Sequence, residues 1–228
     1  MGVFGSPFFL MATPDYAKST ELDAVNAILM SVGESPVNTL DTQSPEVAIA
    51  QTTLRQVVRE VQTEGWSFNQ ENAVPFTVDA NDQVEVSDAI LQIDTNRYHH
   101  LDTYNVIIKA TTTTVNNKLV TTRKLYDLYA KKDTFPEEET LYCDVVWCYS
   151  YEDVPQPFKD YMTAKAIRIA MLRMIGNLEQ SKALEQDEVV ARAAAIEYDT
   201  RQSDYNVFND EQHKFAYRSF RPFQALAR

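Results

Sequence analysis

The stretch SPEVAIAQTTLRQVVREVQTEGW, residues 44–66, carries the signals of one complete helix. Ser44 can accept hydrogen bonds from the first free backbone N–H groups, Pro45 needs no N–H at the first helical position, and the charge of Glu46 suits the positive end of the helix dipole. Gly65 and Trp66 mark the end of the helix and the start of a new pattern. Apolar residues recur every three or four positions between them, at Val47, Ala50, Leu54, Val57, Val58 and Val61.

A shorter helix is predicted just before this stretch. Thr20 and Asp23 have the spacing of a capping box at its start, and Gly33 can supply the left-handed residue at its end. The segment 34–38, which contains Pro36, is a short turn, so the two helices are expected to pack as an antiparallel pair. The stripe of the shorter helix consists of Leu22, Val25, Ile28, Leu29 and Val32.

The periodicity changes after Trp66. Val74, Phe76 and Val78 alternate, as do Val84 and Val86, and Asn and Asp clusters separate further β-branched and aromatic runs. Residues 70–152 therefore predict an inserted antiparallel β domain of about five to seven short strands. Acidic residues outnumber basic ones about two to one in this region, so its surface is expected to be acidic.

Helical patterns return at Pro157. One stripe, which includes Lys165, Leu172 and Ile175, stops at Gly176; a further helix is expected from about Ser181 to Ser203, with small residues such as Ala194 and Ala195 on its packing face. Helices on both sides of the β region can bury their stripes only if the two halves meet. The expected fold class is α+β: a split four-helix bundle with an inserted antiparallel β domain. The expected segments are 1–18 (N-terminal extension), 19–69 and 153–211 (bundle halves), 70–152 (β domain) and 212–228 (C-terminal arm).

The expected arm has a different composition from the acidic body. The whole chain carries a formal net charge of −12, yet residues 212–228 contain no acid. Basic and aromatic side chains alternate in it, which favours docking on a partner, although a terminus without contacts is the alternative. The candidate partner-binding residues are Lys214, Phe215, Tyr217, Arg218, Phe220, Arg221 and Phe223.

The net negative charge argues against binding of a nucleic acid backbone by the body of the protein. Glycines are close together only at Gly2 and Gly5, so phosphate-cradling loops of the common kinds are excluded, and no zinc or nucleophile motif occurs. No cofactor and no metal are expected. A carboxylate pair for glycan hydrolysis stays open because acids are abundant, but no motif indicates one.

Three small groups of residues have both a structural and a functional interpretation. His99 and His100 would point to opposite faces of an extended segment, which favours an exposed loop or a partner contact over a metal site. Residues 137–139, all Glu, indicate a solvated turn. Trp66 and Trp147 are expected in the core rather than as ligand platforms.

The two cysteines lie in the strand-like run 141–149. Cys143 and Cys148 would point to opposite faces about 16 Å apart, so they are expected to be buried, reduced thiols. The chain has no apolar run long enough to cross a membrane and no recognisable signal peptide, which indicates a soluble, non-secreted protein.

Several segments together resemble the tail tubular protein A family of short-tailed bacteriophages. They are residues 24–29 (AVNAIL), 31–40 (SVGESPVNTL) and 65–69 (GWSFN), with weaker similarity at 124–127, 153–166 and 205–206. The resemblance covers 20–69 well and 153–210 loosely, and it is poor over 70–150. In structural terms it rests on the cap and turn residues Gly33, Pro36, Ser44, Pro45, Gly65 and Trp66.

The resemblance implies a virion structural protein rather than an enzyme. It implies a head-to-tail adaptor, made in the host cytoplasm, whose copies form a dodecameric ring between the portal protein and the tail nozzle protein. It also implies contacts with the tail fibre protein and passage of viral DNA through the channel without specific binding. The alternatives are a tail-associated glycan hydrolase and a soluble acidic binding module.

Overall fold

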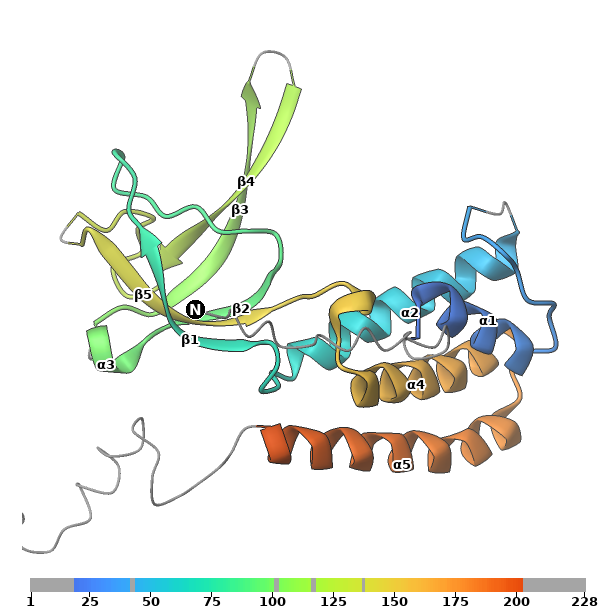
Figure 1. Ribbon diagram of the computed structural model, residues 1–228. Helices are drawn as coiled ribbons and strands as arrows, with labels where there is room; N and C mark the ends of the chain where they lie inside the picture. The colour runs from blue at the N-terminus through green and yellow to red at the C-terminus, as the bar shows by residue number, and fades with distance from the viewer. Residues whose placement is uncertain (1–18, 42–43, 101–102, 116–117, 137, 203–228) are drawn as a thin grey trace, which may run out of the picture.

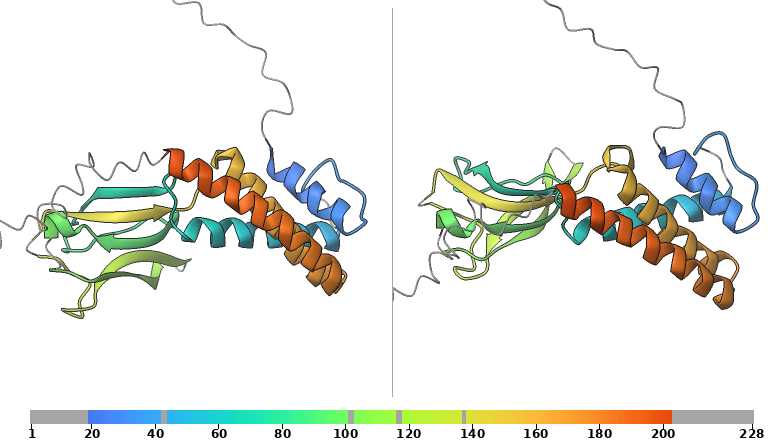
Figure 2. Two further views of the ribbon diagram at one scale, coloured as in Figure 1. Left: turned by 90° about the horizontal axis from the view of Figure 1, so that it is seen from below. Right: turned by 60° about the horizontal axis from the view of Figure 1, so that its bottom comes forward.

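A computed structural model of the protein describes residues 19–41, 44–100, 103–115, 118–136 and 138–202 (Figure 1). Its helices and antiparallel strands confirm the predicted α+β class. The four long helices gather at one end of an elongated molecule, and the strands and the one-turn helix α3 (Arg97–His100) at the other (Figures 1 and 2). Each end has a hydrophobic cluster of its own.

The helical end is built from segments that precede and follow the β region. They are α1 (Glu21–Ser31), α2 (Pro45–Thr63), α4 (Gln156–Met174) and α5 (Leu178–Gln202), with a 3-10 turn, η1 (Tyr151–Asp153), before α4. Helix α4 packs against α1, α2 and α5. A single cluster of buried residues contains side chains from all four helices, including Val25, Leu54, Phe158, Tyr161 and Ala195.

Helix α1 has the ends that its sequence predicts. The Thr20 hydroxyl accepts from Asp23 N, and the Asp23 carboxylate accepts from Thr20 N at 2.9 Å, which completes the capping box. Gly33, with φ +86°, follows the C-cap in the left-handed region. Beyond it, next to Pro36, the backbone of Val37 both donates to and accepts from the side-chain amide of Asn26, at 2.8 and 2.9 Å. This pair holds the turn in place.

Helices α1 and α2 run in opposite directions along each other, as the short turn between them suggests (Figure 1). The start of α1 lies beside the middle of α2, where the Glu21 carboxylate accepts from Arg55 Nε at 2.9 Å.

The start of α2 differs from the prediction in one detail. Pro45 occupies the first turn as expected, but the Ser44 side chain makes no capping hydrogen bond to the backbone. Its hydroxyl donates to the carboxylate of Glu46 instead. The predicted capping role of Ser44 is therefore wrong, because a charged acceptor two residues away competes with the backbone for the hydroxyl.

The strands form two antiparallel sheets. Strands β1 (Gln70–Thr77), β5 (Thr140–Trp147) and β2 (Ile90–Thr95) lie in the order β1-β5-β2, while β3 (Val106–Val115) and β4 (Lys118–Asp127) form a hairpin that projects from the rest (Figure 1). Residues 84–86, predicted as a strand, contribute only an isolated bridge between Glu85 and Lys124. Val84 is nevertheless fully buried in the cluster between the sheets.

Helices α4 and α5 form an antiparallel hairpin around Gly176, which has φ +73°. Lys165 is buried with the apolar stripe of α4, but Leu172 and Ile175, expected on the same stripe, are 39% and 49% exposed because α4 passes the end of the core there. On α5, Ala195 is buried, whereas Ala194 is exposed, contrary to the prediction.

Gly65 offers a test of this fold. Its φ is +76°, and a Cβ there would meet Val146 Cγ2 at 3.5 Å, an ordinary contact, so the backbone conformation alone requires glycine. Gly65→Val should lower the free energy of unfolding by about 1–2 kcal/mol or more, because a β-branched residue is strained at positive φ. Gly65→Asn should lower the free energy of unfolding by less, since Asn tolerates positive φ. Chemical unfolding of both variants measures the difference, and equal losses would mean that the conformation is not what selects glycine.

Candidate functional site

The two ends of the molecule meet where the chain crosses between them, at the end of α2 and at the end of β5. Gln62, the last buried side chain of α2, lies opposite Tyr149, which follows β5. Gln62 Nε2 donates to Tyr149 O at 3.0 Å, and Tyr149 N donates to Gln62 Oε1 at 2.8 Å. The fully buried side-chain amide of Gln62 therefore pairs with both the N–H and the C=O of one residue, as a neighbouring strand would.

Asn69 completes this junction. Its Nδ2 donates to Gln62 O and to Trp147 O, both at 2.8 Å, and its Oδ1 accepts from Trp66 N at 2.8 Å. Trp147 N in turn donates to Asn69 O at 2.8 Å. The two chain crossings are thus hydrogen-bonded to each other.

Aromatic side chains pack around the same junction. Trp66 meets the edge of Phe158 with ring centroids 4.9 Å apart and donates from Nε1 to Val61 O at 2.7 Å. The ring centroids of Phe68 and Phe158 are 4.6 Å apart. Trp66 is 8% exposed, which confirms its predicted place in the core, and Trp147 is half-buried against the second cluster.

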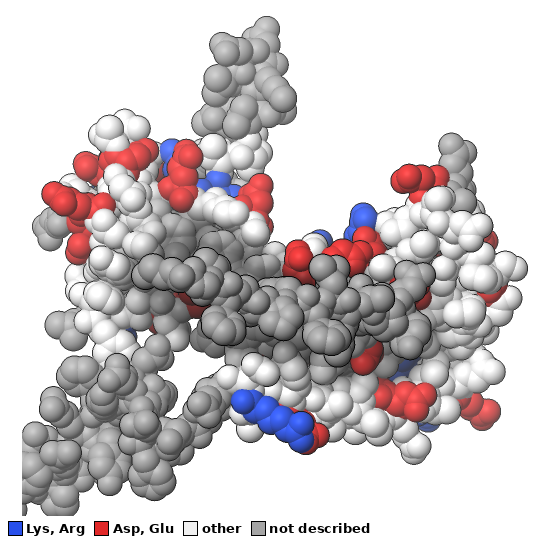
Figure 3. Space-filling model, viewed as in Figure 1, with Lys and Arg blue, Asp and Glu red and all other residues white. Residues whose placement is uncertain are grey.

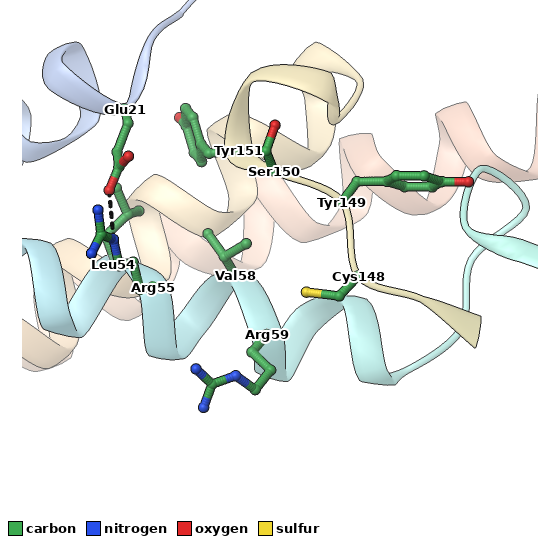
Figure 4. A pocket seen from close by; sticks show the side chains of 9 residues that line it. All are labelled: Glu21, Leu54, Arg55, Val58, Arg59, Cys148, Tyr149, Ser150 and Tyr151. Carbon is green, nitrogen blue, oxygen red and sulfur yellow. Dashed lines mark hydrogen bonds and ion pairs between the residues drawn. The ribbon is translucent and has the colours of Figure 1, made fainter. Parts of the chain in front are cut away.

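A groove of about 290 Å³ lies beside the junction, between α2, the start of α1 and residues 148–151 (Figure 4). We call it the α2 groove. Its floor is apolar, with Leu54 and Val58, and its rim carries Arg55 and Arg59. Arg55 pairs with Glu21, whereas Arg59 has no ion-pair partner among the described residues and extends away from Tyr151. The other lining residues are Cys148, Tyr149 and Ser150.

Burial changes the acidity of the groups near the groove. It raises the pKa of the Cys148 thiol, an effect that the positive charge of Arg59 opposes. It raises the pKa of Tyr151 to about 12, although the hydrogen bond with the Thr163 hydroxyl acts in the other direction. Both the Cys148 thiol and the Tyr151 phenol are therefore mainly neutral at neutral pH.

Both cysteines are unbridged, as predicted. Cys143 is fully buried on β5, and burial raises the pKa of its thiol to about 12. Cys148 departs from the prediction in part, because β5 ends at Trp147 and its thiol is only half-buried.

Two lysines are buried in the helical end, and each has partners. Lys159 Nζ donates to Ser19 O and Glu152 O, at 3.1 and 3.0 Å, which holds the start of the described chain against α4. Lys165 Nζ pairs with Glu60 at 2.9 Å across α2 and α4. The position of Lys165 on an apolar stripe was a sequence signal of its burial, and Asn69 ends the segment 65–69 on which the family resemblance partly rests. Nothing in the sequence marked Gln62 or Lys159.

Of the two histidines expected in an exposed loop or partner contact, His99 is exposed and His100 is not. They lie in a one-turn helix, α3 (Arg97–His100), and His100 is buried. Its Nε2 accepts from Tyr142 N at 2.9 Å, while His99 stacks on the Tyr142 ring. The prediction of a loop or partner contact is therefore wrong for His100, which ties α3 to β5. No cluster of metal-ligating side chains occurs within the described ranges.

The expected solvated turn at 137–139 is also partly wrong. Glu138 is half-buried and accepts from Tyr104 Oη at 3.3 Å, with His100 Nδ1 at 3.7 Å. Glu137 lies outside the described residues. So do the predicted partner-binding residues Lys214 to Phe223, whereas the cap and turn residues from Gly33 to Trp66 are all placed.

The described carboxyl groups with a shifted pKa give no sign of a general acid. The pKa values of Asp23, Glu46 and Asp79 are all lowered, in each case mainly by a hydrogen bond that stabilises the charged form. A glycosidase acid needs the opposite shift. In the β region, Asp144 Oδ1 accepts from Ala73 N and Asn96 Nδ2, which assigns it a structural role.

The model of one protein family, described as tail tubular protein, matches residues 22–205. The chain belongs to the tail tubular protein family. The match spans both bundle halves and the β region between them, so it includes the junction and the α2 groove. The protein is accordingly a structural component of the phage tail. No curated protein matches the chain. None of the described helices is long and apolar enough to span a membrane.

We expect Gln62→Leu to destabilise this tail tubular protein. The substitution leaves the N–H and C=O of Tyr149 without their partners, which should lower the free energy of unfolding by about 1–3 kcal/mol. Gln92→Leu is the matched control, because Gln92 also donates to a backbone carbonyl, Thr63 O, but at an exposed site. Chemical unfolding of the Gln92→Leu variant should show a free energy of unfolding lowered by less than about 0.5 kcal/mol. Similar losses for both would argue against a special role of the junction.

The raised pKa values predict a loss of stability in alkali. In the unfolded chain the Cys143 thiol and the Tyr151 phenol ionise at their ordinary values, 9.0 and 10.0, whereas in the folded protein both pKa values are about 12. Between these limits the unfolded state binds fewer protons, so the free energy of unfolding should fall as the pH rises above about 9. Urea unfolding at about pH 8 and pH 10.5 measures the fall. Tyr151→Phe should make it smaller; an unchanged slope in that variant would remove Tyr151 from the explanation.

Proposed function

We propose that this tail tubular protein is the head-to-tail adaptor of a short-tailed phage. Its copies form a closed ring, dodecameric as in the family it resembles, between the portal protein and the tail nozzle protein. The ring surrounds the channel through which viral DNA leaves the capsid, and it helps to dock the tail fibre protein. The observation that carries the proposal is the family match across both ends of the molecule.

The architecture suits a ring subunit. We take the two hydrophobic clusters as the cores of a helical domain and an inserted β domain, with the boundaries near residues 69 and 153. The junction of Gln62, Asn69 and Tyr149 fixes the β domain relative to the helices. A ring needs the same two surfaces repeated in every copy at a constant angle, and rigid helical faces provide such surfaces.

The charge suits a channel that DNA passes without sticking. Each copy has a net charge of −12, and acidic side chains occur over both ends of the face in Figure 3. A ring of such copies repels the phosphate backbone, which favours transport over binding. Contact with the DNA is therefore non-specific. The family match supports a structural role for the protein rather than an enzymatic one.

Residues 212–228 are the proposed docking arm. Lys214, Arg218 and Arg221 provide hydrogen-bond donors, while Phe215, Tyr217, Phe220 and Phe223 provide apolar anchors. The portal protein or an adjacent copy is the proposed partner of this arm.

Electron microscopy tests the adaptor proposal directly. The purified chain is imaged alone and after mixing with the portal protein of the same phage, and the subunits in any closed ring are counted. A ring seated on the portal supports the proposal. A folded protein that forms no ring in either sample would overturn it in favour of a binding module or a glycan hydrolase, and a glycan-cleavage assay separates those two.

Removal of residues 212–228 should weaken portal attachment by about tenfold or more, because anchor residues carry most of the affinity of an interface. The fold should stay intact, since the arm lies beyond α5. Co-sedimentation with portal protein measures attachment, and circular dichroism checks the fold. Undiminished attachment of the truncated chain would show that the arm is not the contact.

A further inference from the structure

Helix α5 exposes an apolar surface that no described residue covers. Ser181 and Ala195 are the two buried positions along its 25 residues. Val189, Val190 and Ile196 are 61%, 69% and 45% exposed. Helical spacing places these three on the outward side together with the exposed Ala193. We call the four residues the α5 patch. Aliphatic side chains exposed together in this way mark an interaction surface.

Acidic side chains precede this patch, and Arg192, which also borders it, is paired with Glu64. Glu185 and Asp187 are exposed and lie one helical turn before Val189 and Val190. A surface that covers the α5 patch must therefore combine apolar area with positive charge at its edge.

The α2 groove has these properties. Its apolar lining includes Tyr149, which is 38% exposed, beside the largely buried Val58. Arg55 and Arg59 make its rim basic, although Glu21 also lines the groove and pairs with Arg55. Arg55 is 61% exposed even with its ion pair to Glu21.

The α5 patch and the α2 groove lie on opposite sides of the helical end. Helix α4 packs against both α2 and α5 and separates them, and in Figure 4 the ribbons of α4 and α5 lie behind the groove. A contact between the two surfaces must therefore join different copies, and it repeats from copy to copy.

We propose that the α5 patch of one copy docks into the α2 groove of the next copy. The valine side chains of the patch enter the groove beside Val58 and Tyr149, while Glu185 and Asp187 face Arg55 and Arg59. A symmetric contact of two α5 patches would give Glu185 and Asp187 no partner from the arginines of the groove, so the head-to-tail contact is favoured. The inference rests on the proposed ring, for which it names the contact between subunits.

Cross-linking tests the contact in the full chain, because a native thiol already lines the groove. Val190→Cys places a second thiol on the α5 patch, and a short bis-maleimide should join it to Cys148 of the next copy. The products should form a ladder that extends beyond dimers. Cys143 does not interfere, since it is fully buried. Leu128→Cys, exposed by 42% in the β domain, is the matched control and should give no ladder.

The cross-linking outcomes separate this inference from the adaptor proposal. A ladder with Val190→Cys that disappears when Cys148→Ser is added supports the contact. Rings in the electron microscope without such a ladder would overturn the contact while the adaptor proposal stands. Products that stop at dimers and persist with Cys148→Ser indicate a symmetric α5 contact and also overturn it. If no assembly forms, alone or with portal protein, both proposals fail.

Charge reversal gives an independent readout. Arg59→Glu and Asp187→Arg should each raise the protein concentration needed for half-assembly by roughly tenfold, because each places like charges across the contact. The double variant restores opposite charges and should recover most of the loss. Sedimentation velocity measures assembly, and circular dichroism confirms that each variant is folded. A double variant as weak as the two single variants would overturn the proposal.

Discussion

Two buried amides, those of Gln62 and Asn69, connect everything else in this protein. The helical end closes only when α2 meets α4, and the β region lies between these helices in the sequence. The chain must therefore leave the bundle after α2 and return before α4 at nearly the same place. Gln62 and Asn69 satisfy the backbone groups of both crossings at once. An apolar side chain at either position would bury unpaired N–H and C=O groups, which is costly.

Across the described residues, every buried side-chain nitrogen and oxygen has a hydrogen-bond partner. Lys159 and Lys165 extend their apolar stems through the core and end on carbonyl or carboxylate oxygens. Exposed groups are mostly acidic. In the proposed contact, the apolar and charged residues of the α5 patch and the α2 groove allow two acidic copies to approach without repulsion. A tail component requires both a rigid core and surfaces that bind specific partners.

The sequence predicted the elements better than it predicted the contacts between them. Local signals were sufficient for the capping box at Thr20, the first-turn Pro45 and the glycines that end α1, α2 and α4, because each depends on residues within one turn. The role of Ser44 was missed because its choice between the backbone and Glu46 depends on side-chain geometry. His100 was misjudged because a single helical turn gives no periodicity to recognise. The roles of Gln62 and Asn69 could not have been found, since their partners Tyr149 and Trp147 lie 87 and 78 residues away and polar residues at helix ends are common.

The paired crossings also set the conditions that any replacement of the β region must meet. Trp147 N donates to Asn69 O, and the side chain of Asn69 donates back to Trp147 O, so the points of entry and exit lie side by side. A substitute hairpin or small sheet must therefore have ends one strand spacing apart. It must also supply the contacts that β2 and β5 make with α2. Residues 69 and 147 are accordingly the positions at which a designed insert would be joined.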